Sequence, residues 1–179
     1  MASGSSTSPV GEQESILKEI NECGDEKQKL LLLTKLAGLK ASRTDSSQEK
    51  ITDQILQLSK KLYGSKSHEY ADALNWQGQL LFKKKNFKQS ADSYHEAAAI
   101  FELAGDEYGS KLMSSVSGEI AGSCASGLCS DNSALYEKLL ELKRKFIGNN
   151  KQPTMIAAML LAEIYSKQHK YDKALPLFK

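Results

Sequence analysis

The 179-residue chain lacks the features that mark several large classes of protein. Its longest aliphatic run, residues 30–33, is far too short to cross a lipid bilayer. Its net charge is only +2, so charge gives no argument for a nucleic acid or an anionic membrane as partner. Only three prolines occur and β-branched runs are rare, whereas Leu, Ala, Lys, Glu and Gln are abundant. This composition favours a helical protein with no membrane partner.

Cysteine is scarce as well. The three cysteines, Cys23, Cys124 and Cys129, follow an N-terminus that has no export signal. We therefore expect reduced, buried thiols in a cytoplasmic protein. Cys124 and Cys129 have no histidine nearby, so we expect neither a metal site nor a bound cofactor.

Catalytic motifs are also lacking. The sequence has no glycine-rich phosphate loop, no zinc-binding His-Glu helix and no hydrolase elbow. His68, His95 and His169 have no Ser, Cys or carboxylate partner at motif spacing. The sequence therefore predicts a protein that is not an enzyme and has no small-molecule substrate.

The N-terminal residues are rich in Ser and Gly and contain no apolar run, which predicts a disordered tail over residues 1–13. Beyond the tail, equivalent residues recur at a fixed step. Tyr94, Tyr136 and Phe178 are each 42 positions apart, and further sets keep the same step: Leu74, Val116 and Ala158; Phe87, Cys129 and Tyr171; Leu81, Ser123 and Tyr165. Self-similarity at this period is typical of a solenoid, which we expect over residues 14–179.

Each repeat has the pattern of two helices. In the clearest repeat, apolar residues recur at helical spacing over residues 70–85 and again over residues 87–104. Gly64, Gly105 and Gly148 close the second helices of successive repeats, because glycine adopts the left-handed conformation that ends a helix. We expect repeats at about 29–70, 71–112, 113–154 and 155–179. Small residues should let the paired helices approach while large aromatic residues fill the space between neighbours; the small ones are Ala71, Gly78, Ala97 and Ala162, and the large ones Tyr94, Phe101, Tyr165 and Phe178.

Two repeats carry a more specific pattern. Residues 74–81 read Leu-x-x-Gln-Gly-x-x-Leu before Ser90 and Tyr94, and residues 158–165 read Ala-x-x-Leu-Ala-x-x-Tyr before Ala174 and Phe178. The pattern resembles the tetratricopeptide repeat (TPR) family, and the step of 42 resembles its kinesin light chain type. The resemblance implies an all-α fold, a right-handed α-solenoid of stacked antiparallel helix pairs whose first helices line a concave groove.

The third repeat departs from this pattern. Ile120 stands where a small residue is expected, and the preceding residues are rich in Ser and Gly. Since each glycine costs a helix about 1 kcal/mol relative to alanine, we expect this to be the least stable helix of the array.

The residues expected on the groove side of the second repeat are Asp72, Asn75, Trp76, Gln79, Phe82 and Lys83. Such a surface can hold an extended peptide, because amide groups bond its backbone and aromatic rings bury its apolar side chains. The third repeat would add Ser114, Ser117, Gly118 and Ala121, and the fourth Met159, Glu163 and Lys167. Two plainer readings stay open: Trp76 as packing between repeats, and Lys83 as part of a solvated turn.

The predicted function is a non-catalytic scaffold that binds peptide segments or partner helices of other proteins, and the resemblance adds a kinesin-light-chain-like cargo adaptor. The alternative is a helical-repeat nucleic-acid-binding protein, which would need a basic stripe along the groove. The last repeat is truncated in this sequence, so we expect its apolar face to drive self-association or to await a further repeat of a longer parent chain.

Overall fold

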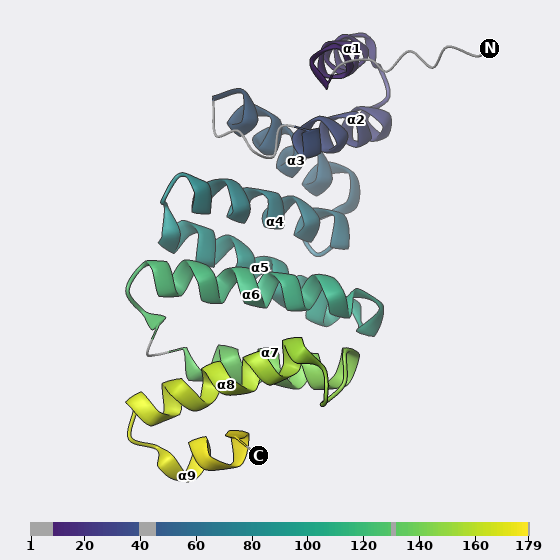
Figure 1. The fold of residues 1–179 in the computed structure, drawn as a ribbon. Coiled ribbons are helices and arrows are strands. Elements are labelled where there is room, and N and C mark those ends of the chain that lie inside the picture. The colour runs from purple at the N-terminus through teal and green to yellow at the C-terminus, as the bar shows by residue number, and fades with distance from the viewer. Residues whose placement is uncertain (1–8, 40–45, 130–131, 179) are drawn as a thin grey trace, which may run out of the picture. The chain divides into compact units, whose positions relative to one another are not determined.

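The computed structural model describes residues 9–39, 46–129 and 132–178, which form helices and no strand (Figure 1). The first helices are α1 (Pro9–Glu22), α2 (Glu26–Leu39), α3 (Ser46–Tyr63) and α4 (His68–Lys83). They are followed by α5 (Phe87–Ala104), the 3-10 segment η1 (Asp106–Tyr108), α6 (Gly109–Ala125) and α7 (Ser133–Phe146). The last elements are α8 (Gln152–Lys167), α9 (Tyr171–Ala174) and the 3-10 segment η3 (Leu175–Phe178). The all-α prediction is confirmed.

The chain divides into two compact units, residues 1–73 and residues 74–179, with the division inside α4. In the first unit, α1 packs on α2 and α2 packs on α3. The core of this unit is aliphatic and contains Ile16, Leu33, Leu36, Ile51 and Ile55. In the second unit, each of the helices from α5 to α9 packs on the next one in the chain. Packing between sequence neighbours is the contact pattern of a helical repeat.

Helix α1 corrects the predicted tail. It begins at Pro9, so residues 9–13 are helical, whereas residues 1–8 lie outside the described residues. Ile16 and Ile20, four positions apart, bury one side of α1. Residues before Ile16 offer no apolar periodicity, which is why the sequence alone placed the start of order too late.

The predicted glycine ends of the second helices are confirmed. Helices α3 and α5 end one residue before Gly64 and Gly105, and Gly148 follows the end of α7 closely. Their φ angles are +90°, +108° and +104°, a region that is strained for residues with a side chain.

A second type of turn joins the two helices of a repeat, and it is the same in three repeats. In the second repeat, Lys84, Lys85 and Asn86 donate backbone hydrogen bonds to the carbonyls of Leu80, Phe82 and Leu81. The third and fourth repeats make the same bonds 42 and 84 positions later, from residues 126–128 and 168–170. The left-handed residue is Lys85, Gly127 or His169, at φ +64°, +92° and +58°. The 42-residue period of the sequence is therefore also a period of the backbone conformation, since the same turn recurs at that spacing.

Close approach of helices explains the glycines of the third repeat. A Cβ atom added at Gly118 would lie 2.6 Å from the Tyr94 ring, and one added at Gly122 would lie 2.9 Å from the α5 backbone. Gly118 is thus covered by Tyr94 and does not offer the open groove surface that the sequence suggested. Helix α6 nevertheless runs over 17 residues, and Ile120 is buried at 6% exposure.

The outcome for the large aromatic residues is mixed. Phe101 and Tyr165 are buried, and Tyr94 is half-buried with its ring against Gly78 and Gly118. Phe178, which was expected to fill space between neighbours, is 61% exposed. It lies in η3, and no later helix in the described residues packs on it.

Candidate functional site

The candidate groove residues of the second repeat lie on one side of α4. The residues from Asn75 to Lys83 belong to the second compact unit, and Asp72 is the neighbouring position one turn earlier on the same helix. Spacings of three and four residues place them in register along the helix. The surface of α4 formed by Asn75, Trp76, Gln79, Phe82 and Lys83 is called the α4 surface below.

Exposure varies along the α4 surface. Gln79 and Lys83 are exposed, Phe82 is 37% exposed, and Asn75 and Trp76 are half-buried. Because Trp76 is only half-buried, both of its predicted roles, packing between repeats and contact with a ligand, stay open. The C-terminal part of the α4 surface, from Gln79 to Lys83, is therefore open to a ligand, whereas its first residues, Asn75 and Trp76, are partly covered by neighbouring residues.

Asn75 is positioned by the next repeat. Its Oδ1 accepts a hydrogen bond of 2.9 Å from the hydroxyl of Ser115 in α6. Ser115 is fully buried, and its single hydroxyl proton is shared between Asn75 Oδ1 and the carbonyl oxygen of Lys111, which lies 3.0 Å away. The amide nitrogen of Asn75 takes no part in this bond, so the fixed side chain keeps a donor group for a ligand carbonyl.

Phe82 is positioned by the following helix. Its ring packs edge to face on the ring of Phe87 at a centroid distance of 5.2 Å. This pair joins the end of α4 to the start of α5 and fixes the aromatic end of the α4 surface.

The corresponding residues are small in the third repeat, and apolar or charged in the fourth. In α6, Ser114, Ser117 and Ala121 are exposed. In α8, Met159 is 59% exposed, and the exposed residues Glu163 and Lys167 form an ion pair of 2.8 Å. That ion pair lowers the pKa of Glu163, chiefly through the hydrogen bond from Lys167.

One pairing was missed from the sequence. Nδ1 of His95 in α5 lies 2.9 Å from Oε1 of Glu119 in α6. Glu119 is buried, whereas the His95 side chain is 71% exposed. The sequence offered no signal, because the two residues are 24 positions apart on different helices. The pair resembles part of a catalytic dyad, but no nucleophile hydrogen-bonds to it in the described ranges.

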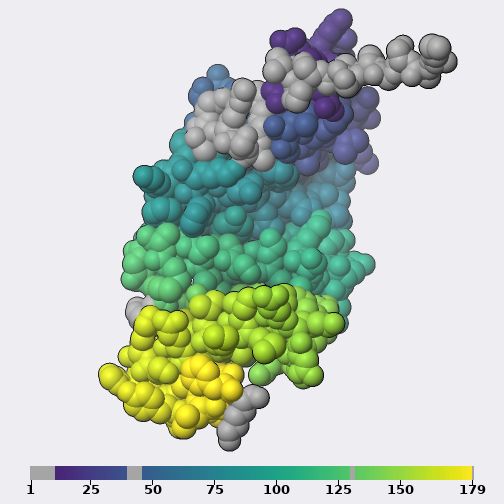
Figure 2. All heavy atoms as spheres, viewed as in Figure 1, coloured from purple at the N-terminus to yellow at the C-terminus, as the bar shows by residue number. Residues whose placement is uncertain are grey.

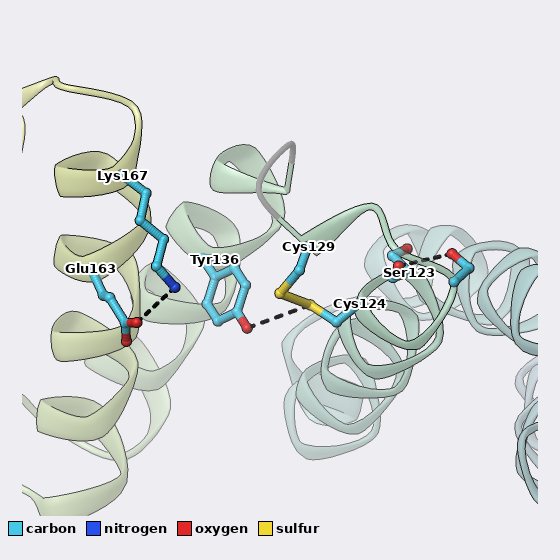
Figure 3. Close-up of a disulfide and its surroundings, with 7 residues drawn as sticks. Ser123, Cys124, Cys129, Tyr136, Glu163 and Lys167 are labelled. Carbon is cyan, nitrogen blue, oxygen red and sulfur yellow. Dashed lines mark hydrogen bonds and ion pairs between the residues drawn. A yellow bond between two sulfur atoms is a disulfide. The ribbon is translucent and has the colours of Figure 1, made fainter.

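The cysteines correct the sequence-based expectation of reduced, buried thiols. Cys124 and Cys129 form a disulfide, and only Cys23, of the described cysteines, is free (Figure 3). Cys124 and Cys129 are half-buried rather than buried. The turn at residues 126–128 reverses the chain and brings the two together, which residue spacing alone does not reveal.

Tyr136 in α7 lies beside the disulfide, as Figure 3 shows. Its hydroxyl donates to Cys124 Sγ over 4.0 Å, since a disulfide sulfur has no proton to give. Burial, and secondarily the charge of Glu163, raise the pKa of Tyr136. Burial also raises the pKa of Tyr94.

A groove of about 790 Å³ lies at the C-terminal end of the second unit. Figure 2 shows the yellow C-terminal segment at the surface there. The groove lies among α7, α8 and η3, and its lining includes Arg144, Met155, Met159, Leu177 and Phe178. A neighbouring pocket is lined by acidic Glu137 and Glu141 as well as basic Arg144 and Lys173.

Two further classes of site are absent from the residues that the structure describes. No cluster of His, Cys, Asp or Glu there could hold a metal ion. No described helix combines the length and apolar character needed to cross a membrane.

Sequence comparison finds no matching family model and no matching curated protein. Structural comparison does find similar folds. The crystal structure of BtubC (BKLC) from P. vanneervenii matches with a TM-score of 0.74 at 17% identity, covering 94% of this chain and 69% of that one.

A putative kinesin light chain from Podosopora anserina, with nearly identical TPR-like repeats, is also similar. One crystal structure of it matches with a TM-score of 0.58 at 12% identity, covering 96% of this chain and 93% of that one. A second matches with a TM-score of 0.58 at 11% identity, covering 94% and 90%. At such identities the likeness shows the fold, which is a TPR-like helical repeat.

Proposed function

We propose that this TPR-like chain is a non-catalytic scaffold that binds extended peptide segments of other proteins on the α4 surface. The main support for the proposal is that polar, aromatic and basic side chains lie along one side of α4 and that two of them are held in place by neighbouring residues. Asn75 is fixed by Ser115 and Phe82 by Phe87, while Gln79 and Lys83 stay exposed. Fixed polar and aromatic groups bind a peptide at low entropic cost, because they are ordered before it arrives.

The chemistry suggests how a peptide would be held. The amide groups of Asn75 and Gln79 bond to its backbone, and the accessible parts of Trp76 and Phe82 bury one of its apolar side chains. Lys83, at the exposed end, favours a peptide with a carboxylate there. Each of these is an ordinary contact, and Trp76 is the type of residue that most often dominates an interface.

The test is selection of binders from a random displayed peptide library, followed by affinity measurement on synthetic peptides. We expect Trp76→Ala to weaken binding by at least about 30-fold, the effect of a 2 kcal/mol hot spot. Gln79→Ala, at an exposed position, should weaken it less without changing stability. The matched control is Asp92→Ala/Glu96→Ala, a pair of exposed changes on α5.

Equal affinities for the wild type and both α4 variants would contradict the proposal. The alternative, nucleic-acid binding, makes a different prediction. Phosphate contacts would give affinity for single-stranded RNA that falls steeply with salt concentration. The α4 surface contains one cation, Lys83, which favours the peptide reading.

A narrower proposal is that the scaffold acts in the cytoplasm as a kinesin-light-chain-like cargo adaptor. Its support is the 42-residue step and the similarity of fold to a putative kinesin light chain. Co-elution of the chain with a purified kinesin heavy chain is expected on this reading. Separate elution at micromolar concentration would remove it and leave the peptide-binding proposal untouched.

We also propose that a second copy of the chain covers the C-terminal groove. Met155, Met159 and Phe178 are more than half exposed beside it. The adjacent pocket contains both acidic and basic side chains, so two copies related by a twofold axis can pair Glu137 or Glu141 with Arg144 or Lys173. Sedimentation should show a concentration-dependent dimer that Met159→Glu abolishes; a monomer at all concentrations would contradict it, and a dimer that the variant leaves unchanged would place the interface elsewhere.

A further inference from the structure

The disulfide lies at two positions of the repeat that carry other side chains in the second and fourth repeats. Cys124 and Cys129 correspond, 42 positions earlier, to Phe82 and Phe87. Those two residues also touch, as an edge-to-face aromatic pair at 5.2 Å. In these two repeats a side-chain pair thus spans the turn between the two helices, aromatic in the second repeat and cystine in the third.

The turn itself does not depend on the disulfide. The backbone hydrogen bonds from residues 126–128 are the same as those from residues 84–86, where no cysteine is present. The fourth repeat makes them again, with Ser166 and Tyr171 at the corresponding positions. Because three different side-chain pairs accompany one turn, the sulfur–sulfur bond can open without removing the turn.

The site is accessible to small reagents. Both cysteines are half-buried, and residues 125–128 between them are exposed. The loop that the bond closes spans a sequence separation of only five, so its contribution to global stability is small compared with that of a long loop. These are properties of a disulfide that can be reduced in the folded protein.

We propose that Cys124 and Cys129 form a reversible dithiol–disulfide site that controls the rigidity of the turn at residues 126–128 and of the start of α7. A dithiol reductant supplies two electrons and two protons, so that the sulfur–sulfur bond becomes two thiols and the reductant becomes its own disulfide. A disulfide oxidant reverses the step. Repeats two and four lack the cysteine pair and do not respond.

The effect reaches α7 through Tyr136. Its hydroxyl contacts Cys124 Sγ, and its ring is buried at 8% exposure in the α7 packing. Opening the bond frees Cys124 to change rotamer and removes the covalent link between the end of α6 and the segment before α7. The first turn of α7, from Ser133 to Tyr136, then loses part of its constraint.

The test uses the full chain with Cys23→Ser, so that the pair provides the only thiols. Maleimide labelling read by mass spectrometry should count no thiols after treatment with oxidised glutathione and two after a dithiol reductant, reversibly. Amide exchange in residues 133–136 should be several-fold faster in the reduced form. Helical circular dichroism should stay unchanged.

Two variants separate a redox effect from a general one. Cys124→Ser/Cys129→Ser should show the fast exchange of the reduced form in both buffers. Cys124→Phe/Cys129→Phe, which copies the second repeat, should show slow exchange that does not respond to redox conditions. The proposal is overturned by two labelled thiols under oxidising conditions, by loss of helix on reduction, or by equal exchange in the two states.

Discussion

Tyr94 packs against glycines on two different helices. A Cβ atom added at Gly78 in α4 would lie 2.9 Å from the Tyr94 ring, and one added at Gly118 in α6 would lie 2.6 Å from it. The same two helices are also joined by a buried hydrogen bond, in which the hydroxyl of Ser90 in α5 donates to the carbonyl of Gly78 in α4 over 2.8 Å. At the residue scale, then, the Tyr94 ring fills a space within the second compact unit that exists because Gly78 and Gly118 have no side chain.

Gly118→Ala tests this packing. Although alanine gains about 1 kcal/mol of helix propensity, the added methyl group overlaps the Tyr94 ring, and overpacking costs typically about 1–3 kcal/mol. We expect a net loss in the free energy of unfolding, measured by urea denaturation. In a Tyr94→Leu background the same change should be neutral or stabilising, and an unchanged penalty there would show that the ring is not the cause.

The raised pKa of Tyr94 predicts a dependence on alkaline pH. Burial favours the neutral phenol, so the folded protein holds this proton to higher pH than the unfolded chain, whose phenol titrates near 10.0. The contribution is complete below that pH and is lost as the pH rises through the folded-state pKa. Thermal unfolding should therefore show a smaller loss of stability between pH 9 and about pH 11 in Tyr94→Phe than in the wild type; identical profiles would rule out Tyr94 as a source.

At the scale of elements, the helices end in two distinct ways. Second helices end near glycines at positive φ, as Gly105 does after α5, whereas the turns inside repeats place Lys85, Gly127 or His169 in the left-handed region. The left-handed residue was predicted for the first type alone, because glycine signals it. Lysine and histidine carry no such signal, and the repeated pattern of backbone hydrogen bonds was needed to identify the second type.

Gly105→Ala tests the glycine ends. Its φ of +108° and ψ of −179° belong to a region that residues with a Cβ occupy at a cost of about 1–3 kcal/mol. The substitution should lower the thermal midpoint and leave the helix content of the folded state intact. Gly24→Ala is the control, since nothing lies within 4 Å of the position of its added Cβ; equal effects of the two substitutions would contradict the conformational explanation.

At the scale of the whole molecule, the chain is a TPR-like helical repeat in two compact units. Contacts join sequence neighbours within each unit, so stability is expected to be a sum of local terms rather than the property of one central core. The α4 surface falls in the second unit, which also contains the disulfide and the C-terminal groove. The proposed binding and redox properties should therefore persist when the first unit is destabilised.

The single tryptophan makes this testable. Trp76 lies in the second unit, whereas circular dichroism reports helices of both units. Leu36→Ala, at a fully buried position of the first unit, should cost about 2–5 kcal/mol and shift part of the dichroism transition to lower urea concentration. The midpoint of Trp76 fluorescence should stay nearly constant; a joint shift of both signals would mean that the units unfold together.

The sequence by itself determined the helical class, the step of 42 and the glycine ends of the second helices. These follow from local physics, since apolar periodicity and the conformational freedom of glycine act within a few residues of the chain. Only the tertiary structure decided that Tyr94 covers Gly118, that Ser115 fixes Asn75, and that Cys124 bonds to Cys129. Each of these contacts depends on the angle and distance at which helices or turns bring separated residues together, and no periodicity in the chain encodes that geometry.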